Sequence, residues 1–261
     1  MLPVRDCVAV ITGGASGIGL ALASHWVEQG GKVVIGDVSE EALERAARQL
    51  GKACVPVRCD VRIEGDCALL ADTAVREFGG LHLAVPCAGI IKDGLLVSPD
   101  RDTGKVTGKM SLEQFQTVVD VNLTGVFLTV RECLERMINT QSRGLICLIS
   151  STGSLGTAGQ INYSSTKAAV SVMPKVITAE LFRRGLADRI RCVAVAPGYV
   201  NTAILQGMNQ KALQKVLEQV PIGRLIEPEE VVSLIMELYR NEALTGDVYY
   251  IHGGLRLGSR G

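Results

Sequence analysis

Short apolar runs alternate with longer amphipathic stretches along almost the whole chain. Apolar runs bounded by turn residues are typical of buried parallel strands, and apolar residues at every third or fourth position indicate helices. The sequence predicts strands over 7–12, 32–36, 53–59, 81–86, 145–149, 190–196 and 247–251. It predicts helices over 18–29, 40–50, 64–78, 112–138, 161–184 and 227–241. This alternation predicts an α/β protein with a doubly wound parallel sheet.

Two segments interrupt the alternation. Residues 98–110 are charged, contain two glycines and have no period, so they are predicted to form a solvated insert loop. Because the loop follows the fourth strand, it could also shape substrate access. Residues 203–225 carry apolar positions at helical spacing and are either a substrate lid or a packed helix. No linker or repeat is visible, so residues 1–261 are predicted to form a single domain.

Charge and cysteine content exclude several classes of protein. The chain has 27 basic and 27 acidic residues with no sustained basic run, which argues against a nucleic-acid partner. No apolar run reaches membrane-spanning length and no signal peptide is seen, so no membrane association is expected. The eight cysteines include no C-x-x-C pair, which favours a reducing, cytoplasmic location and no metal site.

A glycine-rich segment, 12–19, joins the first strand to the first helix. Its spacing is G-x-x-x-G-x-G, and glycines there permit a tight turn and close backbone approach to a ligand. The helix N-terminus offers free N–H groups and a partial positive charge to a pyrophosphate. We therefore expect a dinucleotide to contact Gly13, Ser16, Gly17, Ile18 and Gly19.

Acidic residues follow the second and third strands. Asp37 lies eighteen residues after Gly19, close to the spacing expected for a carboxylate that binds the adenosine ribose. Its charge would repel a 2′-phosphate, and no Lys or Arg lies at 13–19 or 37–39, so NAD is favoured over NADP. The alternative is a turn or helix-capping aspartate. Asp60 ends the third strand, where it could line the adenine pocket.

The segment from Ser150 to Lys167 carries the candidate chemistry. Tyr163 and Lys167 are four residues apart, so on a helix they lie on one face. An ammonium about 4 Å away supplies roughly the 4 kcal/mol that would lower a phenol pKa from about 10 towards 7. Ser150 could hold a substrate oxygen by a hydrogen bond. Y-x-x-x-K is common on helices, but here it follows a strand and a Gly-rich turn, which indicates acid–base chemistry on an alcohol or carbonyl.

Two further positions complete the candidate site. Asn122 lies among apolar residues within a predicted helix, so its amide needs partners. These are either backbone and a water linked to Lys167, or a purely structural hydrogen bond. Pro197 and Gly198 stop the strand at 190–196 and would leave backbone groups free for a nicotinamide carboxamide.

Together these motifs resemble the short-chain dehydrogenase/reductase family over nearly the whole chain. The resemblance rests on T-G-G-A-S-G-I-G, Asp37, Asp60-Val61, the C-A-G triplet, Asn122, Ser150, Y-S-S-T-K and P-G. It implies a Rossmann-like sheet of about seven strands and a catalytic tetrad of Asn122, Ser150, Tyr163 and Lys167. Implied cofactor contacts beyond the glycine-rich segment are Asp37, Asp60, Val61, Cys87, Ala88, Gly89, Tyr163, Lys167, Pro197, Gly198, Val200 and Thr202.

The resemblance also implies a role for each member of the tetrad. Tyr163 would be the general acid and base, and Lys167 would bind the nicotinamide ribose and lower the tyrosine pKa. Ser150 would orient the substrate, and Asn122 would hold the water of a proton relay. Of the two adjacent serines, Ser150 is selected because it lies thirteen residues before Tyr163.

Within the family, A-G-I-I-K-D-G-L-L, G-Q-I-N-Y-S-S-T-K-A and P-I-G-R-L-I-E-P-E-E-V resemble the 3-oxoacyl-acyl-carrier-protein reductases. The chain departs from them in Asp37, since that group usually takes NADPH, in the longer loop 98–110, and in Pro86-Cys87, which replaces Asn-Asn. The expectation is an NAD(H)-dependent oxidoreductase that interconverts a secondary alcohol and a ketone on a small-molecule or acyl-carrier-bound substrate.

Assembly and alternatives follow from the same resemblance. The family suggests a homotetramer or homodimer built on the helices 112–138 and 161–184. One alternative is a dehydrogenase of another small alcohol, sugar or steroid. Another is a regulatory protein that binds NAD and catalyses nothing, against which the intact Ser-Tyr-Lys set argues.

Overall fold

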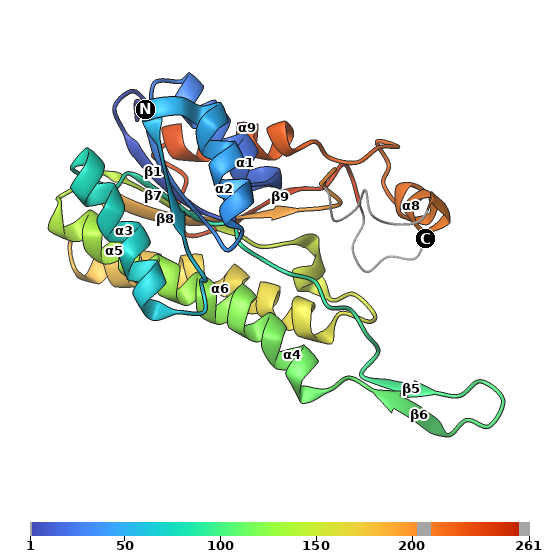
Figure 1. Ribbon diagram of the computed structural model, residues 1–261. Helices are drawn as coiled ribbons and strands as arrows, with labels where there is room; N and C mark the ends of the chain where they lie inside the picture. Colours follow the sequence, from blue (N-terminus) through green and yellow to red (C-terminus); the bar gives the residue numbers. More distant parts are fainter. Residues whose placement is uncertain (1, 203–209, 256–261) are drawn as a thin grey trace.

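Seven parallel strands form the central sheet of the computed structural model, which describes residues 2–202 and 210–255 (Figure 1). Their order across the sheet is β3-β2-β1-β4-β7-β8-β9. The bounds are β1 Val8–Thr12, β2 Lys32–Asp37, β3 Cys54–Arg58, β4 Leu83–Pro86, β7 Gly144–Ile149, β8 Ile190–Pro197 and β9 Val248–Ile251. The predicted doubly wound α/β sheet is confirmed. Its winding reverses between β1 and β4, and the crevice at such a point is where these sheets bind ligands.

Helices cover both faces of the sheet (Figure 1). One layer holds α1 (Gly17–Glu28), α2 (Glu40–Leu50) and α9 (Pro228–Arg240). The opposite layer holds α3 (Glu64–Phe78), α5 (Gly125–Asn139) and α6 (Ile161–Arg183). α4 (Leu112–Val119) precedes α5, and α8 (Gln210–Leu217) lies beyond β8. The predicted helices thus lie close to their expected positions, apart from the one predicted over 112–138.

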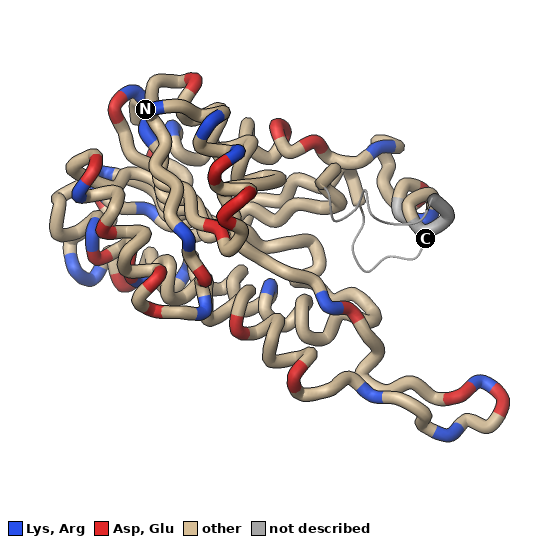
Figure 2. The backbone as a smooth tube through the Cα atoms, in the orientation of Figure 1, with Lys and Arg blue, Asp and Glu red and all other residues tan. Residues whose placement is uncertain are grey.

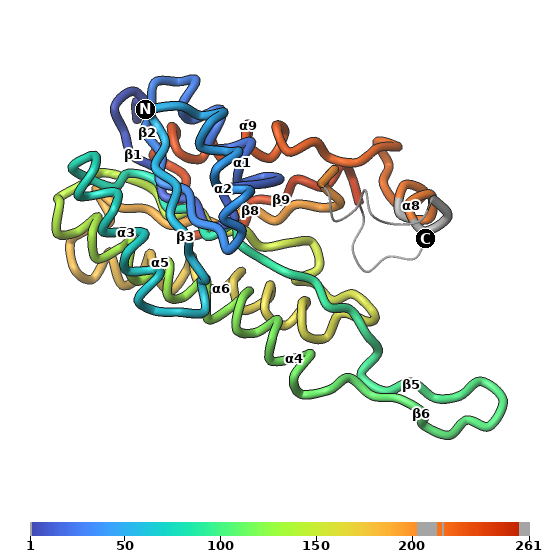
Figure 3. Tube along the Cα trace, viewed as in Figure 1, coloured from blue at the N-terminus to red at the C-terminus, as the bar shows by residue number. Residues whose placement is uncertain are grey.

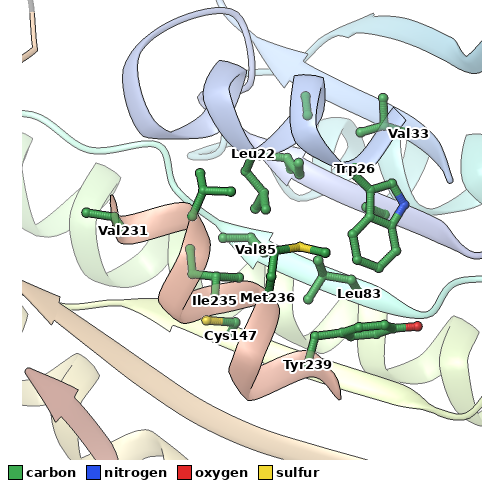
Figure 4. Close-up of a cluster of buried hydrophobic side chains, with 14 of the residues drawn as sticks. Leu22, Trp26, Val33, Leu83, Val85, Cys147, Val231, Ile235, Met236 and Tyr239 are labelled. Carbon is green, nitrogen blue, oxygen red and sulfur yellow. The ribbon is translucent and has the colours of Figure 1, made fainter. Parts of the chain in front are cut away.

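The core between the sheet and the first helical layer is filled by large side chains (Figure 4). The rings of Trp26 and Tyr239 meet edge to face with centroids 4.8 Å apart, and Leu83 and Val85 of β4 pack nearby. Both polar ring atoms have partners, because Trp26 Nε1 donates to the Cys7 carbonyl and the Tyr239 hydroxyl donates to Pro3. This packing holds α1, and therefore the glycine-rich turn before it, against β1 and β4.

The predicted helix 112–138 is interrupted by one wider turn. Residues Asp120–Thr124 form a π-helical segment between α4 and α5, and Asn122 lies in it with no exposed surface. The Asn122 amide both accepts from the Ile90 N–H and donates to the Ile90 carbonyl. Such π-turns are frequent at functional sites. The interruption therefore coincides with the contact that ties this helix to the chain after β4.

The predicted insert loop is instead a β-hairpin. β5 (Val97–Pro99) pairs antiparallel with β6 (Val106–Lys109), and the hairpin projects from the body of the protein (Figures 1 and 3). Asp100 organises its turn by accepting from the Thr103 N–H and hydroxyl. We call residues 95–109 the arm. The predicted lid, 203–225, falls partly outside the described residues, and its described part contains α8.

Candidate functional site

The glycine-rich turn has a shape that only small residues permit. Gly13 has φ +61°, and a Cβ there would lie 2.9 Å from the Ala88 Cα. Gly17 has φ +52° and begins α1, and its added Cβ would approach the Thr202 side chain at 3.5 Å. Ser16, the N-cap of α1, makes no side-chain capping bond. The helix N–H groups together with this backbone turn therefore fit the pyrophosphate of a dinucleotide.

The ends of β1, β2 and β4 surround this turn. Thr12 Oγ1 accepts from the Ala88 N–H at 3.2 Å and so joins the ends of β1 and β4. Asp37 is partly buried at the end of β2 and accepts from the Ser39 N–H at 3.2 Å. Arg58 pairs with Asp37 in strand register, a proximity that sequence spacing did not reveal. Its guanidinium Nε lies 3.4 Å from the Glu40 carboxylate.

Asp60 and Val61 lie beside the turn but differ in what they present. The Asp60 carboxylate accepts from the Arg62 backbone N–H and guanidinium, and these contacts hold its pKa below the ordinary value. Val61 is buried against Gly125, where an added Cβ would come within 2.5 Å of the valine side chain. Arg62 is thus the partner of Asp60 that the sequence reading missed. An adenine contact would have to share the carboxylate with this arginine.

Cys87, Ala88 and Gly89 connect the turn to the candidate catalytic residues. The half-buried Cys87 side chain lies near the Gly19 N–H and the Lys167 amine, and desolvation of its thiol raises the pKa to about 11. A Cβ added at Gly89 would lie 3.4 Å from Asn122 Oδ1 and 3.9 Å from Lys167 Nζ. The loop after β4 therefore passes between the cofactor turn and the two polar groups of the predicted tetrad.

The segment after β8 ends the strand where predicted, but its backbone N–H groups are hydrogen-bonded. Pro197 ends β8, as predicted, but the Gly198 N–H donates to the Ile251 carbonyl at 2.8 Å. The Thr202 N–H donates to the Val200 carbonyl, also at 2.8 Å, and Val200 is buried. The Gly198 N–H, which was expected to be free, thus already has a partner, and so does the Thr202 N–H. Thr202 still lies at the N-terminus of α1, facing Gly17.

Tyr163 and Lys167 share one face of α6, as their spacing predicts, but their electrostatics differ from expectation. Lys167 Nζ donates to the Ile149 carbonyl at 2.8 Å and lies 5.7 Å from the centre of the Tyr163 ring. Burial lowers the pKa of Lys167 to about 8. The pKa of Tyr163 is raised, chiefly by burial, and the Asp93 charge raises it further while a Ser151 hydrogen bond lowers it. In the cofactor-free protein the pKa of Tyr163 is thus shifted upward, opposite to the direction that the spacing from Lys167 suggests.

The two adjacent serines face different surroundings. Ser150 is buried, donates to the Lys167 carbonyl at 3.0 Å and lies 2.7 Å from the Ser171 hydroxyl. Ser151 has extended backbone, and its hydroxyl accepts from the Gly153 N–H. Its Oγ and the Tyr163 ring lie on the same side of Gly153, 3.3 Å and 3.2 Å from a Cβ built there, and a Ser151 hydrogen bond lowers the pKa of the phenol. Sequence spacing placed Ser150 beside the phenol, whereas the structure places Ser151 there.

A polar clamp holds the catalytic helix to the root of the arm. Gln160 donates to Asp93 Oδ2 at 2.8 Å, and Asn162, which is fully buried, donates to the Lys92 carbonyl at 2.8 Å. The Tyr163 N–H in turn donates to Asn162 Oδ1. These residues were not singled out from the sequence, because their partners lie about seventy positions away. They orient the first turn of α6 and so the phenol.

The buried amine of Lys167 yields a stability prediction. Because its folded pKa of about 8 lies below the ordinary 10.5, the unfolded chain binds more protons between these values. Wild-type stability should therefore rise as pH increases through this window. Lys167→Met should raise the unfolding free energy at pH 7 by roughly 1–3 kcal/mol. Loss of the hydrogen bond to the Ile149 carbonyl offsets part of this gain.

Urea unfolding of both proteins at pH 7 and pH 10 measures this effect. The gain from Lys167→Met should shrink at the higher pH, since the wild-type amine is then neutral in the folded protein. Other titrating groups are common to both chains and cancel in the difference. A gain that does not change with pH would contradict a burial cost at this amine.

The fold and site define a Rossmann-type dinucleotide-binding oxidoreductase, with a glycine cradle at the switch point and a Ser-Tyr-Lys group beside it. The chain matches the family of short chain dehydrogenases over residues 7–213, and it belongs to that family. As a member it is an alcohol–ketone oxidoreductase that uses a nicotinamide cofactor and acts on small-molecule substrates.

Several curated relatives align over most of their length. The chain is 34% identical over 253 residues to a 3-oxoacyl-[acyl-carrier-protein] reductase of Thermotoga maritima. This alignment covers 95% of this chain and 97% of the relative. It is 34% identical to the human 3-hydroxyacyl-CoA dehydrogenase type-2, covering 97% of each chain. It is 38% identical to an uncharacterised oxidoreductase of Mycobacterium bovis, covering 94% of this chain and 95% of the relative.

Two absences concern residues 2–202 and 210–255, the part of the chain that the structure describes. No helix in this part is long and apolar enough to cross a membrane. The same residues contain no group of three or more His, Cys, Asp or Glu side chains placed to hold a metal ion.

Proposed function

We propose that the protein is an NAD(H)-dependent oxidoreductase that interconverts a secondary alcohol and a ketone. The observation that carries the proposal is the convergence of Ser151, Tyr163 and Lys167 next to the glycine cradle at the β1–β4 switch point. The cradle holds the dinucleotide through backbone N–H groups, and Asp37 accepts hydrogen bonds from the adenosine ribose. When bound, the cofactor supplies or accepts the hydride at its nicotinamide ring.

The chain's own residues move the proton and hold the substrate oxygen. In reduction the Tyr163 hydroxyl donates its proton to the carbonyl oxygen, and in oxidation the phenolate takes it from the alcohol. Its raised pKa keeps the phenol protonated at neutral pH, which suits proton donation. Ser151 orients the substrate oxygen by a hydrogen bond. Lys167 keeps positive charge next to the site and holds the nicotinamide ribose.

Asn122 and Ser150 act by positioning other groups of the site. Asn122 fixes the loop after β4 through both polar groups of Ile90, and a proton-relay water would have to share these contacts. Ser150 fixes the Lys167 backbone through its carbonyl. Both roles set where the reacting groups lie.

The substrate class is proposed from apolar surfaces near the site and from the relatives. Next to the first turn of α6 lies a cavity of about 400 Å³, lined by Leu95, Leu96, Val97, Ala158 and Ile161 without charged side chains. The relatives named above include a 3-oxoacyl-carrier reductase and a 3-hydroxyacyl-CoA dehydrogenase. An apolar 3-oxoacyl or similar substrate fits both observations. A sugar or steroid alcohol remains the alternative within the same reaction.

Location and assembly are proposed on separate grounds. All eight cysteines are free thiols, which supports the reducing cytoplasm. Exposed apolar residues on α5 and α6, among them Phe127, Val172 and Val176, support a homodimer or homotetramer built on these helices.

Cofactor choice gives a direct test. Initial rates of ketone reduction at equal cofactor concentration should be at least about tenfold higher with NADH than with NADPH, because the Asp37 carboxylate repels a 2′-phosphate. Asp37→Ala should lower the ratio of the NADH rate to the NADPH rate. Asp102→Ala, which removes an exposed carboxylate of the arm, should leave this ratio unchanged. A preference for NADPH in the wild type would contradict the role of Asp37.

The same assay distinguishes the proposed reductase of apolar oxo substrates from a sugar or steroid dehydrogenase and from a regulator without activity. A panel of 3-oxoacyl esters, cyclic ketones, sugars and steroids is added to enzyme and NADH, and oxidation of NADH is followed by absorbance. Turnover of apolar oxo substrates supports the proposal, and turnover of sugars alone would favour the alternative. NADH binding without turnover of any carbonyl would favour the regulator.

A further inference from the structure

The arm exposes an apolar face. Val97 and Pro99 are two residues apart on β5 and so share a face, and Val106 pairs with Pro99 across the hairpin. Val106 is 60% exposed and Val97 is 50% exposed. Leu95, Leu96 and Val97 also line the cavity proposed above for the substrate, so Val106 is the apolar residue of the arm that lies outside that cavity. An isolated two-stranded hairpin is marginally stable in water. A hairpin with this much exposed apolar surface is stabilised when another surface covers it.

An apolar groove lies at the other end of the same helical layer. It is formed by Leu134 and Ile138 of α5 and by Ile177, Leu181 and Leu186 on and after α6, with a volume of about 360 Å³. Glu180, Arg183 and Arg184 form its rim. We call this the α5–α6 groove. Its apolar floor and charged rim match the composition of the arm.

One helix connects the two features. The arm root joins the segment before α6, because the Gly94 N–H donates to the Gly159 carbonyl, and the groove lies at the C-terminal end of α6. From Ile161 to Glu180 the helix axis extends about 28 Å. The arm of one chain also projects away from its own helices (Figures 1 and 3), so it does not cover its own groove.

The surface between arm and groove suits helix-to-helix contact. Along α6 the exposed residues at three- or four-residue spacing are small or apolar: Ser165, Ala168, Val172, Val176 and Ala179. Phe127 of α5 is exposed beside them. Isologous packing of two copies about a two-fold axis perpendicular to α6 would set the two α6 helices antiparallel. Each arm would then lie at the partner's groove.

We propose that the arm of each chain packs its apolar face into the α5–α6 groove of a second copy of the chain. Charge supports this pairing (Figure 2). The arm turn carries Asp100 and Asp102, and the rim of the groove carries Arg183 and Arg184, so the two surfaces bring opposite charges. The turn also carries Arg101 and Lys105, which can remain in solvent at the tip.

A cross-link tests the contact directly in the full chain. Val106→Cys and Glu180→Cys are combined, the protein is oxidised with copper phenanthroline, and the products are separated on a non-reducing gel. Cysteines form a disulfide only when their Cα atoms lie within about 7 Å, so a bridge between these positions has to join two copies. We expect a covalent dimer from the double variant and not from either single variant. Equal dimer yields in all three would overturn the proposal.

A charge in the apolar face provides the second measurement. Val106→Asp should raise the dissociation constant of the dimer at least about tenfold in sedimentation velocity. Ser98→Asp, on the face of β5 opposite to Val97, should leave that constant unchanged. Unchanged NADH binding in both variants shows that the fold is intact. A wild-type chain that is monomeric, or a dimer that tolerates both variants equally, would overturn the proposal, the latter because another surface would then hold the copies together.

Discussion

Tyr163→Phe is expected to lower kcat by about a thousandfold or more while NADH binding changes by no more than a few-fold. The variant removes one oxygen, the only part of the side chain that can exchange a proton with substrate. The ring remains, so its packing against Gly153, where an added Cβ would lie 3.2 Å from the ring, is preserved. Stopped-flow measurement of ketone reduction and fluorescence titration with NADH report the two quantities separately.

The pH dependence of wild-type turnover sharpens this test. Oxidation of the alcohol requires the phenolate, and the pKa of Tyr163 is raised by burial in the cofactor-free chain. The rate of oxidation should therefore rise with pH, whereas reduction should not require high pH. Tyr163→Phe should abolish the titration along with the rate. Retained activity with the same pH profile would contradict the assignment of the acid and base.

The sheet could be predicted because strands buried on both faces leave a clear pattern. All six residues of β7 are buried, and they form a continuous apolar run between turn residues. The hairpin of the arm could not be predicted in this way. Its strands Val97–Pro99 and Val106–Lys109 are short, contain Pro and Gly, and are exposed. Neither a period nor an apolar run distinguishes them from a loop.

The site could be predicted where chemistry depends on local spacing. Tyr163 and Lys167 share a helix face by their four-residue separation alone, and the glycine turn follows its strand directly. The direction of the Tyr163 pKa shift could not be predicted, because its largest cause is burial, which the spacing of residues does not reveal. Partners such as Arg62 on Asp60 and Ile90 on Asn122 depend on how the loops after the strands turn.

The adjacent serines are a second case in which sequence spacing does not decide which residue lies in the site. In extended backbone neighbouring side chains point to opposite sides, so one of Ser150 and Ser151 faces the core and the other faces the site. Counting residues back from Tyr163 does not identify which serine faces the site. The 3₁₀ turn Thr152–Leu155 lies between the serines and Tyr163, and its shape determines how many residues the chain needs to reach α6. The hydrogen bonds of the folded protein favour Ser151.

Ser151→Ala should lower kcat by about a hundredfold, since it removes a hydrogen-bond donor directed at the reacting oxygen. Ser150→Ala should change kcat by no more than a few-fold and instead lower the free energy of unfolding by about 1–2 kcal/mol. The reason is that its hydroxyl bonds the Lys167 carbonyl and the Ser171 hydroxyl inside the protein. Steady-state kinetics and urea unfolding of the two variants, which delete the same atom one residue apart, provide the comparison.

The pattern across the two variants decides the assignment. A large loss of kcat with normal stability in Ser151→Ala, and the reverse in Ser150→Ala, is the result expected from the hydroxyl partners. Thr at position 151 keeps a hydroxyl, so Ser151→Thr should retain much more activity than Ser151→Ala. If Ser150→Ala instead loses turnover with unchanged stability, the thirteen-residue spacing identifies the substrate-orienting serine. The hydrogen bond between Ser151 and Tyr163 would then serve only to hold the phenol.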